Sequence, residues 1–206
     1  MIDQIAAATG GDVPRETFER LQCYASLLIE ENEHQNLVGR STIEELWQRH
    51  IVDSAQLVRF APRADSSWLD IGSGAGLPGL VVAILTEGPI ALVEPRKLRA
   101  DFLQRAAEEI GLAHRVTVHA TKVERVTGAF EVITARAVAA LEVLLRISQH
   151  LSTDKSLWLF PKGKSAQSEL DEVRRTWQGS FRLVRSRTHP ASAIVVAEHV
   201  QRRGKR

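Results

Sequence analysis

The sequence predicts an α/β fold of Rossmann-like type, with a mostly parallel, seven-stranded sheet and helices on both of its faces. Three observations predict it. Short apolar strands alternate with helical stretches from residue 68 to residue 177, and this alternation is typical of parallel sheets. A glycine-rich turn follows the first of these strands, at residues 72–76. The last two strands leave no room for a helix between them, so one strand near the C-terminus should run antiparallel.

We expect residues 1–62 to form a helical extension and residues 63–206 to form the α/β domain. Apolar side chains recur at helical spacing over residues 14–33, which predicts the first helix. A Ser-Thr pair followed three residues later by Glu is a capping-box pattern, and it predicts a second helix over residues 41–60.

The elements of the domain follow from short apolar runs and from amphipathic stretches that end at glycine or proline. We expect strands at residues 68–71, 90–93, 116–118, 130–134, 156–160, 181–187 and 193–199. We expect helices between them at residues 77–85, 97–110, 138–150 and 165–177.

Composition is that of an ordinary globular protein. The chain has 206 residues, of which 44% are hydrophobic and 25% charged, which argues against disordered and fibrous classes. No run of about 18 apolar residues could span a membrane, and no signal peptide is visible at the N-terminus. Cys23 is the only cysteine, so an internal disulfide and a cysteine-based metal site are excluded, and a cytoplasmic location is expected.

Charge is unevenly distributed along the chain. Residues 136–206 contain 14 Lys or Arg and 6 Asp or Glu, whereas residues 1–135 contain 13 and 19. This asymmetry indicates a polyanionic partner for the C-terminal half. A solvated surface with a basic tail would have the same composition, so the counts alone leave both interpretations open.

The most informative stretch is residues 70–76, Asp-Ile-Gly-Ser-Gly-Ala-Gly, where a predicted strand passes into a helix. Glycine adopts positive φ and has no Cβ, so the backbone can approach a ligand closely. The N-terminus of the following helix presents unpaired N–H groups. Glu94 ends the next strand, where a carboxylate can accept hydrogen bonds from both hydroxyls of a ribose. Together these features predict a nucleoside-binding site.

Two ligands fit this pattern. Residues 74–79 match the G-x-G-x-x-G motif of dinucleotide-binding proteins, and residues 72–76 match the tighter G-x-G-x-G of S-adenosylmethionine enzymes. We favour the second because Asp70 directly precedes the glycines and because the chain is too short to include the substrate domain of a dehydrogenase. A reversed strand at the end of the sheet is also usual in methyltransferases. Glycines that merely turn a tight loop remain a third interpretation.

Several segments of the chain occur in the same order in one known family. They are Asn36-Leu37, Arg49 to Ser54, Trp68 to Gly79, Val123-Glu124, Thr134 to Ala137 and Pro161-Lys162-Gly163. Over roughly residues 15–200 the chain resembles the RsmG (GidB) family of bacterial methyltransferases. The resemblance implies a Rossmann-like class I methyltransferase that uses S-adenosylmethionine to methylate N7 of one guanine in the decoding-region stem-loop of 16S rRNA. Its partner would be 16S rRNA or the small ribosomal subunit.

This sequence departs from the family pattern in two places. Residues 95–97, Pro-Arg-Lys, follow the acid after the second strand, where small polar residues are more usual. The segment at residues 134–136 is Thr-Ala-Arg, whereas the family usually has Ser before Arg. Both departures could alter the edge of the cofactor pocket.

The expected cofactor site combines the glycine motif with positions that the resemblance assigns. Its residues are Gly72, Gly74, Gly76, Leu77, Glu94, Val123, Glu124 and Arg136. Val123 and Glu124 would lie near the adenine edge, although Glu124 could also be a surface acid. Arg136 ends the fourth strand, where its guanidinium could hold the methionine carboxylate or an RNA phosphate, or form a solvent-exposed ion pair.

The expected substrate-binding residues are His50, Asp53, Ser54, Arg136, Lys162 and Lys164. The first three share one helical face at positions i, i+3 and i+4, which could either lean over the pocket or hold a buried turn. The two lysines follow the fifth strand, where they could meet phosphates or lie free in a loop. No cluster of side chains supplies the ligands of a metal ion.

The expected chemistry requires no general acid or base, because guanine N7 already carries a lone pair. Orientation of the base can lower the barrier by about 7–11 kcal/mol, so we assign no catalytic residue. The base must be splayed out of the RNA before N7 can be reached, and Phe160 is a candidate residue at the lip of its pocket. A methyltransferase for another substrate and a non-catalytic nucleotide- or RNA-binding module remain alternatives.

Overall fold

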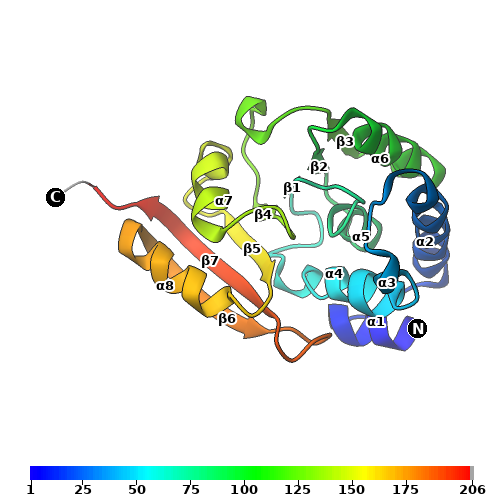
Figure 1. Ribbon diagram of the computed structural model, residues 1–206, viewed down its shortest axis with the longest axis horizontal. Coiled ribbons are helices and arrows are strands. Elements are labelled where there is room, and N and C mark those ends of the chain that lie inside the picture. Colours follow the sequence, from blue (N-terminus) through cyan, green and yellow to red (C-terminus); the bar gives the residue numbers. More distant parts are fainter. Residues whose placement is uncertain (205–206) are drawn as a thin grey trace.

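The central sheet has seven strands in the order β3-β2-β1-β4-β5-β7-β6 (Figure 1). The computed structural model describes residues 1–204, without the side chain of Arg40. The strands are β1 (Trp68–Ile71), β2 (Ile90–Val93), β3 (Val116–His119), β4 (Val132–Thr134), β5 (Leu157–Lys162), β6 (Trp177–Arg185) and β7 (Ala193–Arg202). Among the described strands, β7 alone runs in the direction opposite to the other six, because it pairs antiparallel with both β5 and β6. The predicted fold class is therefore confirmed.

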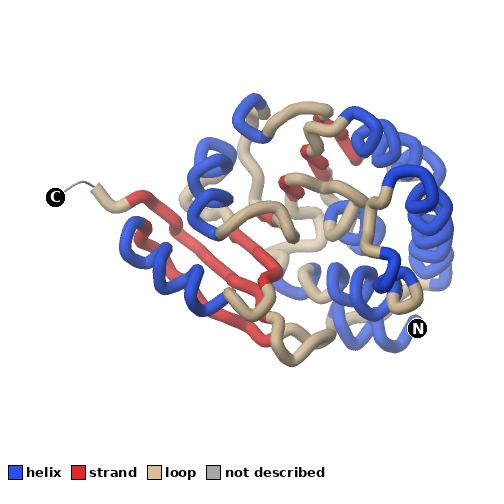
Figure 2. Tube along the Cα trace, viewed as in Figure 1, coloured by secondary structure: helices blue, strands red, loops and turns tan. Residues whose placement is uncertain are grey.

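Helices surround the sheet (Figure 2). They are α1 (Ile2–Thr9), α2 (Arg15–Gln35), α3 (Arg40–Ile43), α4 (Asp53–Ala55), α5 (Gly79–Leu85), α6 (Lys97–Glu109), α7 (Leu141–Ser148) and α8 (Ala166–Thr176). A π-helical turn, η1 (Trp47–Val52), precedes α4, and three 3-10 turns complete the set: η2 (Val58–Phe60), η3 (Val123–Arg125) and η4 (Gln149–Leu151). None of the helices in residues 1–204 is long and apolar enough to cross a membrane.

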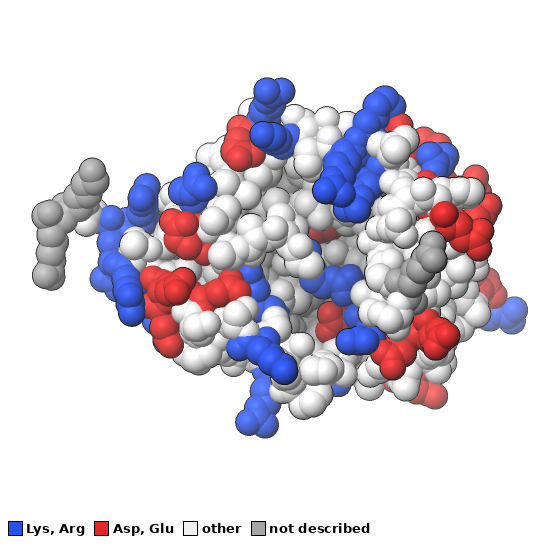
Figure 3. Space-filling view, viewed as in Figure 1, with Lys and Arg blue, Asp and Glu red and all other residues white. Residues whose placement is uncertain are grey.

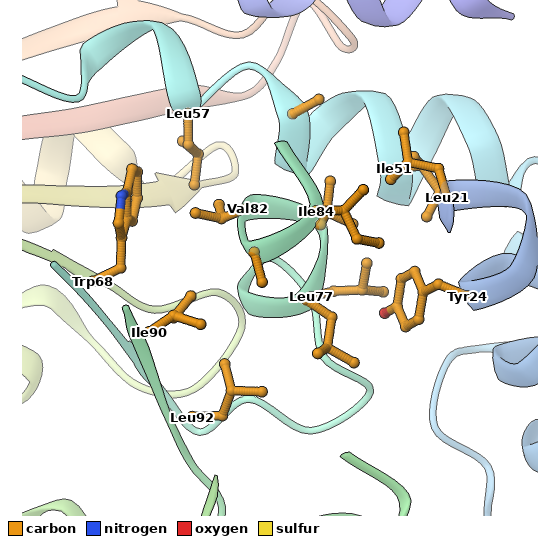
Figure 4. Packing of buried hydrophobic residues seen from close by; sticks show 14 of the residues in the cluster. Leu21, Tyr24, Ile51, Leu57, Trp68, Leu77, Val82, Ile84, Ile90 and Leu92 are labelled. Carbon is orange, nitrogen blue, oxygen red and sulfur yellow. The ribbon is translucent and has the colours of Figure 1, made fainter. Parts of the chain in front are cut away.

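Two hydrophobic cores form because successive strand residues point to opposite faces of the sheet. The first core packs helices α1, α2, α5 and α6 against residues such as Trp68, Ile90 and Leu92 (Figure 4). The second packs α7 and α8 against residues such as Leu69 and Trp158. The N-terminal helices thus share a core with the sheet, and the division expected at residue 62 stays a prediction.

The segment expected to form one helix over residues 41–60 is instead divided into α3, η1, α4 and η2. The predicted capping box does not form. Gly39 is the N-cap of α3, and the Thr42 hydroxyl donates to the Gly39 carbonyl oxygen at 2.8 Å. The π-helical turn contains His50 and directly precedes Asp53, and such turns occur often at functional sites.

Other elements also differ from the sequence prediction, and most of the remaining strands and helices are displaced at their ends by one to three residues. Helix α1 was not predicted, because it is short, has no side-chain cap and buries only Ile5 and Ala8. Helix α7 begins at Leu141 rather than at residue 138, since residues 136–140 form a loop in which Ala137 has a φ of 57°. Helix α5 begins at Gly79, two residues later than predicted, and β6 begins four residues early, directly after α8.

Candidate cofactor and substrate site

The glycine loop joins β1 to α5 and holds three glycines with positive φ. Gly72, Gly74 and Gly76 have φ values of 65°, 55° and 90°. A Cβ at Gly72 would lie 2.6 Å from a methyl group of Val138, and one at Gly76 would lie 2.7 Å from Leu80. At Gly74 the nearest atoms would be 3.7 Å away. The loop is therefore packed at its two ends and open at Gly74, where a ligand can reach the backbone.

Glu94 is fixed against this loop. Its side chain is buried, one carboxylate oxygen accepts the Gly74 N–H at 2.9 Å, and the other accepts the Arg96 N–H at 2.8 Å. A carboxylate has about four acceptor positions, so each oxygen can still accept one more hydrogen bond. The acid predicted to bind a ribose thus lies beside the open part of the glycine loop.

Helix α2 contacts the glycine loop through the side chain of Tyr24. The buried Tyr24 hydroxyl donates to the Ala75 carbonyl oxygen at 2.8 Å. Leu77 points into the first core together with Tyr24 (Figure 4), so only its backbone is left to face a ligand. The N-terminal helices therefore help to hold the conformation of the glycine loop.

Asp70 precedes the loop and is fully buried. One of its carboxyl oxygens accepts the Gly79 N–H at 3.1 Å, and the other has no hydrogen-bond partner among the described residues. A Cβ at Gly79 would lie 2.6 Å from this carboxyl group, so glycine is required for the close approach. Burial raises the pKa of Asp70 from 3.8 to about 7.

We expect the Asp70→Asn variant to change the pH dependence of stability. Because the folded-state pKa lies above the unfolded-state value, the contribution of Asp70 is full below about pH 4 and is lost as the pH rises through 7. The stability of the wild type relative to the variant should fall over this range by up to about 4 kcal/mol. Urea unfolding at pH 5 and pH 8 measures the difference, and parallel pH profiles of the two proteins would contradict it.

Arg136 meets His50 and Asp53 at the carboxyl end of β4. Its guanidinium lies 3.2 Å from His50 Nδ1 and 3.4 Å from Asp53 Oδ2. Arginine can only donate, so Nδ1 accepts and the Nε2–H of His50 donates to the Thr42 hydroxyl at 2.9 Å. Burial and the charge of Arg136 lower the pKa of His50 to about 4. His50 is therefore neutral at neutral pH.

Asp53 also joins this end of β4 to the turn after β6. Its Oδ1 accepts hydrogen bonds from Gln56 at 2.8 Å, Thr188 at 2.5 Å and Ser186 at 3.3 Å. Ser54, in contrast, is fully buried in the core, and its hydroxyl has no partner among the described residues. Of the three residues predicted to share a face, only His50 and Asp53 contact Arg136.

The Lys162 ammonium is engaged by other groups of the protein. It donates to the Ala139 carbonyl oxygen at 2.6 Å and to Glu169 at 2.8 Å. Glu169 in turn accepts the Leu141 N–H at 2.7 Å and the Ser165 hydroxyl at 2.6 Å. Burial raises the pKa of Glu169, but the hydrogen bonds from Lys162, Ser165 and Leu141 outweigh it and bring the pKa below its ordinary value. The pair thus ties the loop before α7 to α8.

Glu169 was missed by the sequence interpretation, because nothing in the spacing of residues along α8 marks it as the partner of a strand residue. Phe160 was predicted to lie at the lip of a pocket, and this prediction is wrong. It is fully buried in the second core with Trp158, because alternate residues of β5 point to that face. Lys164, unlike Lys162, is exposed.

A pocket of about 510 Å³ opens beside these residues, where β4 and β5 end and β7 begins. Polar groups of Asp53, Arg136, Lys162 and Ser186 line it together with the apolar side chain of Val138. Val138 also packs on Gly72, so the pocket adjoins the glycine loop. Figure 3 shows this face hollowed near its centre, with Lys and Arg side chains around the hollow.

The two residues expected near the adenine edge lie on η3, after β3. Val123 is buried in the second core, and Glu124 is exposed. Their contact with a ligand stays a prediction. Among the described residues, no group of three His, Cys, Asp or Glu side chains could hold a metal ion.

The reversed seventh strand, the open glycine loop and the fixed acid beside it define an S-adenosylmethionine-dependent methyltransferase of the Rossmann-like class. Two solved structures illustrate this fold. The ribosomal protein L11 methylase of Lactobacillus delbrueckii subsp. bulgaricus is 14% identical, with a TM-score of 0.59 over 76% of this chain and 79% of its own. An O-methyltransferase of Thermotoga maritima is 16% identical, with a TM-score of 0.57 over 86% of this chain and 73% of its own.

The chain belongs to the GidB family, described as rRNA small subunit methyltransferase G, whose model matches residues 17–191. Relatives named ribosomal RNA small subunit methyltransferase G support the assignment. That of Zymomonas mobilis is 46% identical over 91% of this chain and 88% of its own. That of Rhizorhabdus wittichii is 48% identical over 95% of this chain and 91% of its own. The protein is therefore a methyltransferase with S-adenosylmethionine as its methyl donor, and the dinucleotide interpretation of residues 74–79 is excluded.

Proposed function

We propose that this enzyme methylates N7 of a single guanine in 16S rRNA, presented as free RNA or within the small ribosomal subunit. The observation that supports this most is the alignment, over nine tenths of the chain, with relatives named for the small-subunit rRNA. The pocket beside the glycine loop offers room for a base. The substrate implies that the protein acts in the cytoplasm.

We propose that the glycine loop and Glu94 hold the nucleoside part of S-adenosylmethionine, which supplies an electrophilic methyl group on its sulfonium. Gly74 is the open point of the loop, and the Glu94 carboxylate beside it keeps free acceptor positions for ribose hydroxyls. Backbone groups of Val123 and Glu124, on η3, would form hydrogen bonds with the edge of the adenine ring. Arg136, at the junction of loop and pocket, would bind the methionine carboxylate or a phosphate.

The target guanine would occupy the pocket between Asp53, Arg136 and Val138. Its N7 lone pair needs no general base, and two properties of His50 support this proposal. His50 is neutral because its pKa is about 4, and its Nδ1 is engaged by Arg136. We therefore propose that these residues orient the base and do not exchange protons with it. Orientation alone can lower the barrier by about 7–11 kcal/mol.

Two lysines have different roles in this proposal. Lys162 shapes the pocket from inside, because its ammonium is engaged by Ala139 and Glu169. Lys164 is exposed and directly follows Gly163, which lines the pocket, so its ammonium would contact an RNA phosphate.

Transfer of a tritiated methyl group tests the proposed substrate. The purified enzyme should label naked 16S rRNA or isolated small subunits, and digestion should yield one N7-methylguanosine. Large-subunit rRNA is the matched control and should stay unlabelled. An enzyme that binds S-adenosylmethionine but labels neither form of 16S rRNA would exclude this substrate and favour a methyltransferase for another molecule.

A further inference from the structure

Three arginines lie close together near β6, which is the edge strand at the opposite end of the sheet from β3. They lie on the face of the sheet that packs against the first core. Arg59 belongs to η2 and Arg182 to β6, and Arg187 follows β6. The guanidinium carbon of Arg59 lies 4.7 Å from the centre of the Phe60 ring, and that of Arg182 lies 5.7 Å from the same centre. One aromatic ring thus holds two guanidinium groups in place by cation–π attraction.

These arginines have no acidic partner in the part of the chain that the structure describes. No described carboxylate oxygen lies within 4.0 Å of Arg59, Arg182 or Arg187, whereas Arg15, Arg63 and other arginines form ion pairs. Burial, and then the charges of Arg187 and Arg182, lower the pKa of Arg59. Like charges held together without counter-charges raise the energy of the folded protein and create a positive potential that an anion would relieve.

The cluster is connected to the pocket. The Arg187 backbone N–H donates to Gln56 Oε1 at 3.0 Å, and both Gln56 and the neighbouring Ser186 line the pocket. The Arg187 guanidinium donates to the Ala7 carbonyl oxygen and lies close enough to Arg59 for its charge to act there. An RNA strand with one base in the pocket would therefore reach these arginines within a few nucleotides.

We propose that Arg59, Arg182 and Arg187 form a second RNA-contact surface, which binds backbone phosphates flanking the target nucleotide. This inference rests on the proposed rRNA substrate. The planar guanidinium forms paired hydrogen bonds with phosphate oxygens, and the Phe60 ring leaves the N–H edges of Arg59 and Arg182 available. Contacts of this kind set the register and orientation of the RNA and carry no base specificity.

The test is a double variant, Arg182→Gln with Arg187→Gln, whose affinity for 16S rRNA is measured over a range of KCl concentrations. Each lost phosphate contact lowers the slope of log affinity against log salt by about 0.7–0.9, so the slope should become shallower by about 1.4–1.8. The KM for rRNA at moderate salt should rise about tenfold or more. The kcat at saturating rRNA and the affinity for S-adenosylmethionine should be unchanged.

The matched control is Arg146→Gln with Arg175→Gln, which removes two exposed charges from α7 and α8 on the opposite face of the sheet. It should leave the salt slope and the KM close to the wild-type values. A cluster variant with wild-type slope and KM, or a control with an equal loss, overturns the inference while the wild-type activity still supports the proposed function. A wild-type enzyme that neither binds nor methylates 16S rRNA overturns both.

Discussion

Replacing Lys162 by Met is expected to lower the free energy of unfolding by about 3–5 kcal/mol, the effect of removing one partner from a buried ion pair. The side chains of Lys162 and Glu169 are only 10% and 17% exposed. Without the ammonium, the Glu169 carboxylate keeps the Leu141 N–H and the Ser165 hydroxyl but loses its counter-charge. The Ala139 carbonyl oxygen also loses its donor. Urea unfolding at neutral pH measures the loss.

A second substitution separates charge from packing. Glu169→Gln added to Lys162→Met removes the uncompensated carboxylate and keeps an acceptor for the Leu141 N–H, so the double variant should regain part of the lost stability. Lys97→Met is the control, because Lys97 forms an ion pair with Asp101 but is 82% exposed, and its loss should cost less than about 1 kcal/mol. A Lys162→Met protein as stable as this control would show that the pair does not hold the loop.

The Glu94→Ala variant should bind S-adenosylmethionine more weakly by about 1–3 kcal/mol, which corresponds to about 5- to 150-fold in Kd. Two losses combine in this effect. The proposed acceptor of the ribose hydroxyls is removed, and the Gly74 and Arg96 N–H groups are left without the carboxylate that now fixes them. Titration calorimetry measures the Kd.

Two further variants identify the cause. Glu94→Gln keeps one acceptor oxygen and should weaken binding less than Glu94→Ala. Glu124→Ala removes an exposed acid on η3 and tests the adenine contact separately from the ribose contact. An unchanged Kd for Glu94→Ala, with an unchanged melting temperature, would remove Glu94 from the ribose role.

The glycine loop could be predicted from the sequence because its determinants are local. Glycines at alternate positions after an apolar strand, and an acid at the end of the next strand, already specify the turn and the place of the carboxylate. The structure adds why each glycine is needed, since the ends of the loop are packed against Val138 and Leu80 and its middle is open.

The pocket could be predicted only in part. His50 and Asp53 were expected to share a face, and Arg136 was expected at the end of a strand, but no local rule connects residues that are 86 and 83 positions apart. Their contact depends on how the π-helical turn lies against the end of β4. The same limit explains why Ser54 and Phe160, both expected near the substrate, are core residues.

The sequence by itself determined the order of the seven strands and of helices α5 to α8, the reversed strand near the C-terminus and the residues of the glycine loop. These follow from hydrophobic periodicity and from the backbone freedom of glycine, which act over a few neighbouring residues. Only the tertiary structure decided which charges are paired. It engages Lys162 with Glu169, neutralises His50 beside Arg136 and leaves Arg59, Arg182 and Arg187 without an acidic partner within residues 1–204. Pairing and burial depend on distances between elements far apart in the chain, and these distances set the pKa of each group and its availability to a substrate.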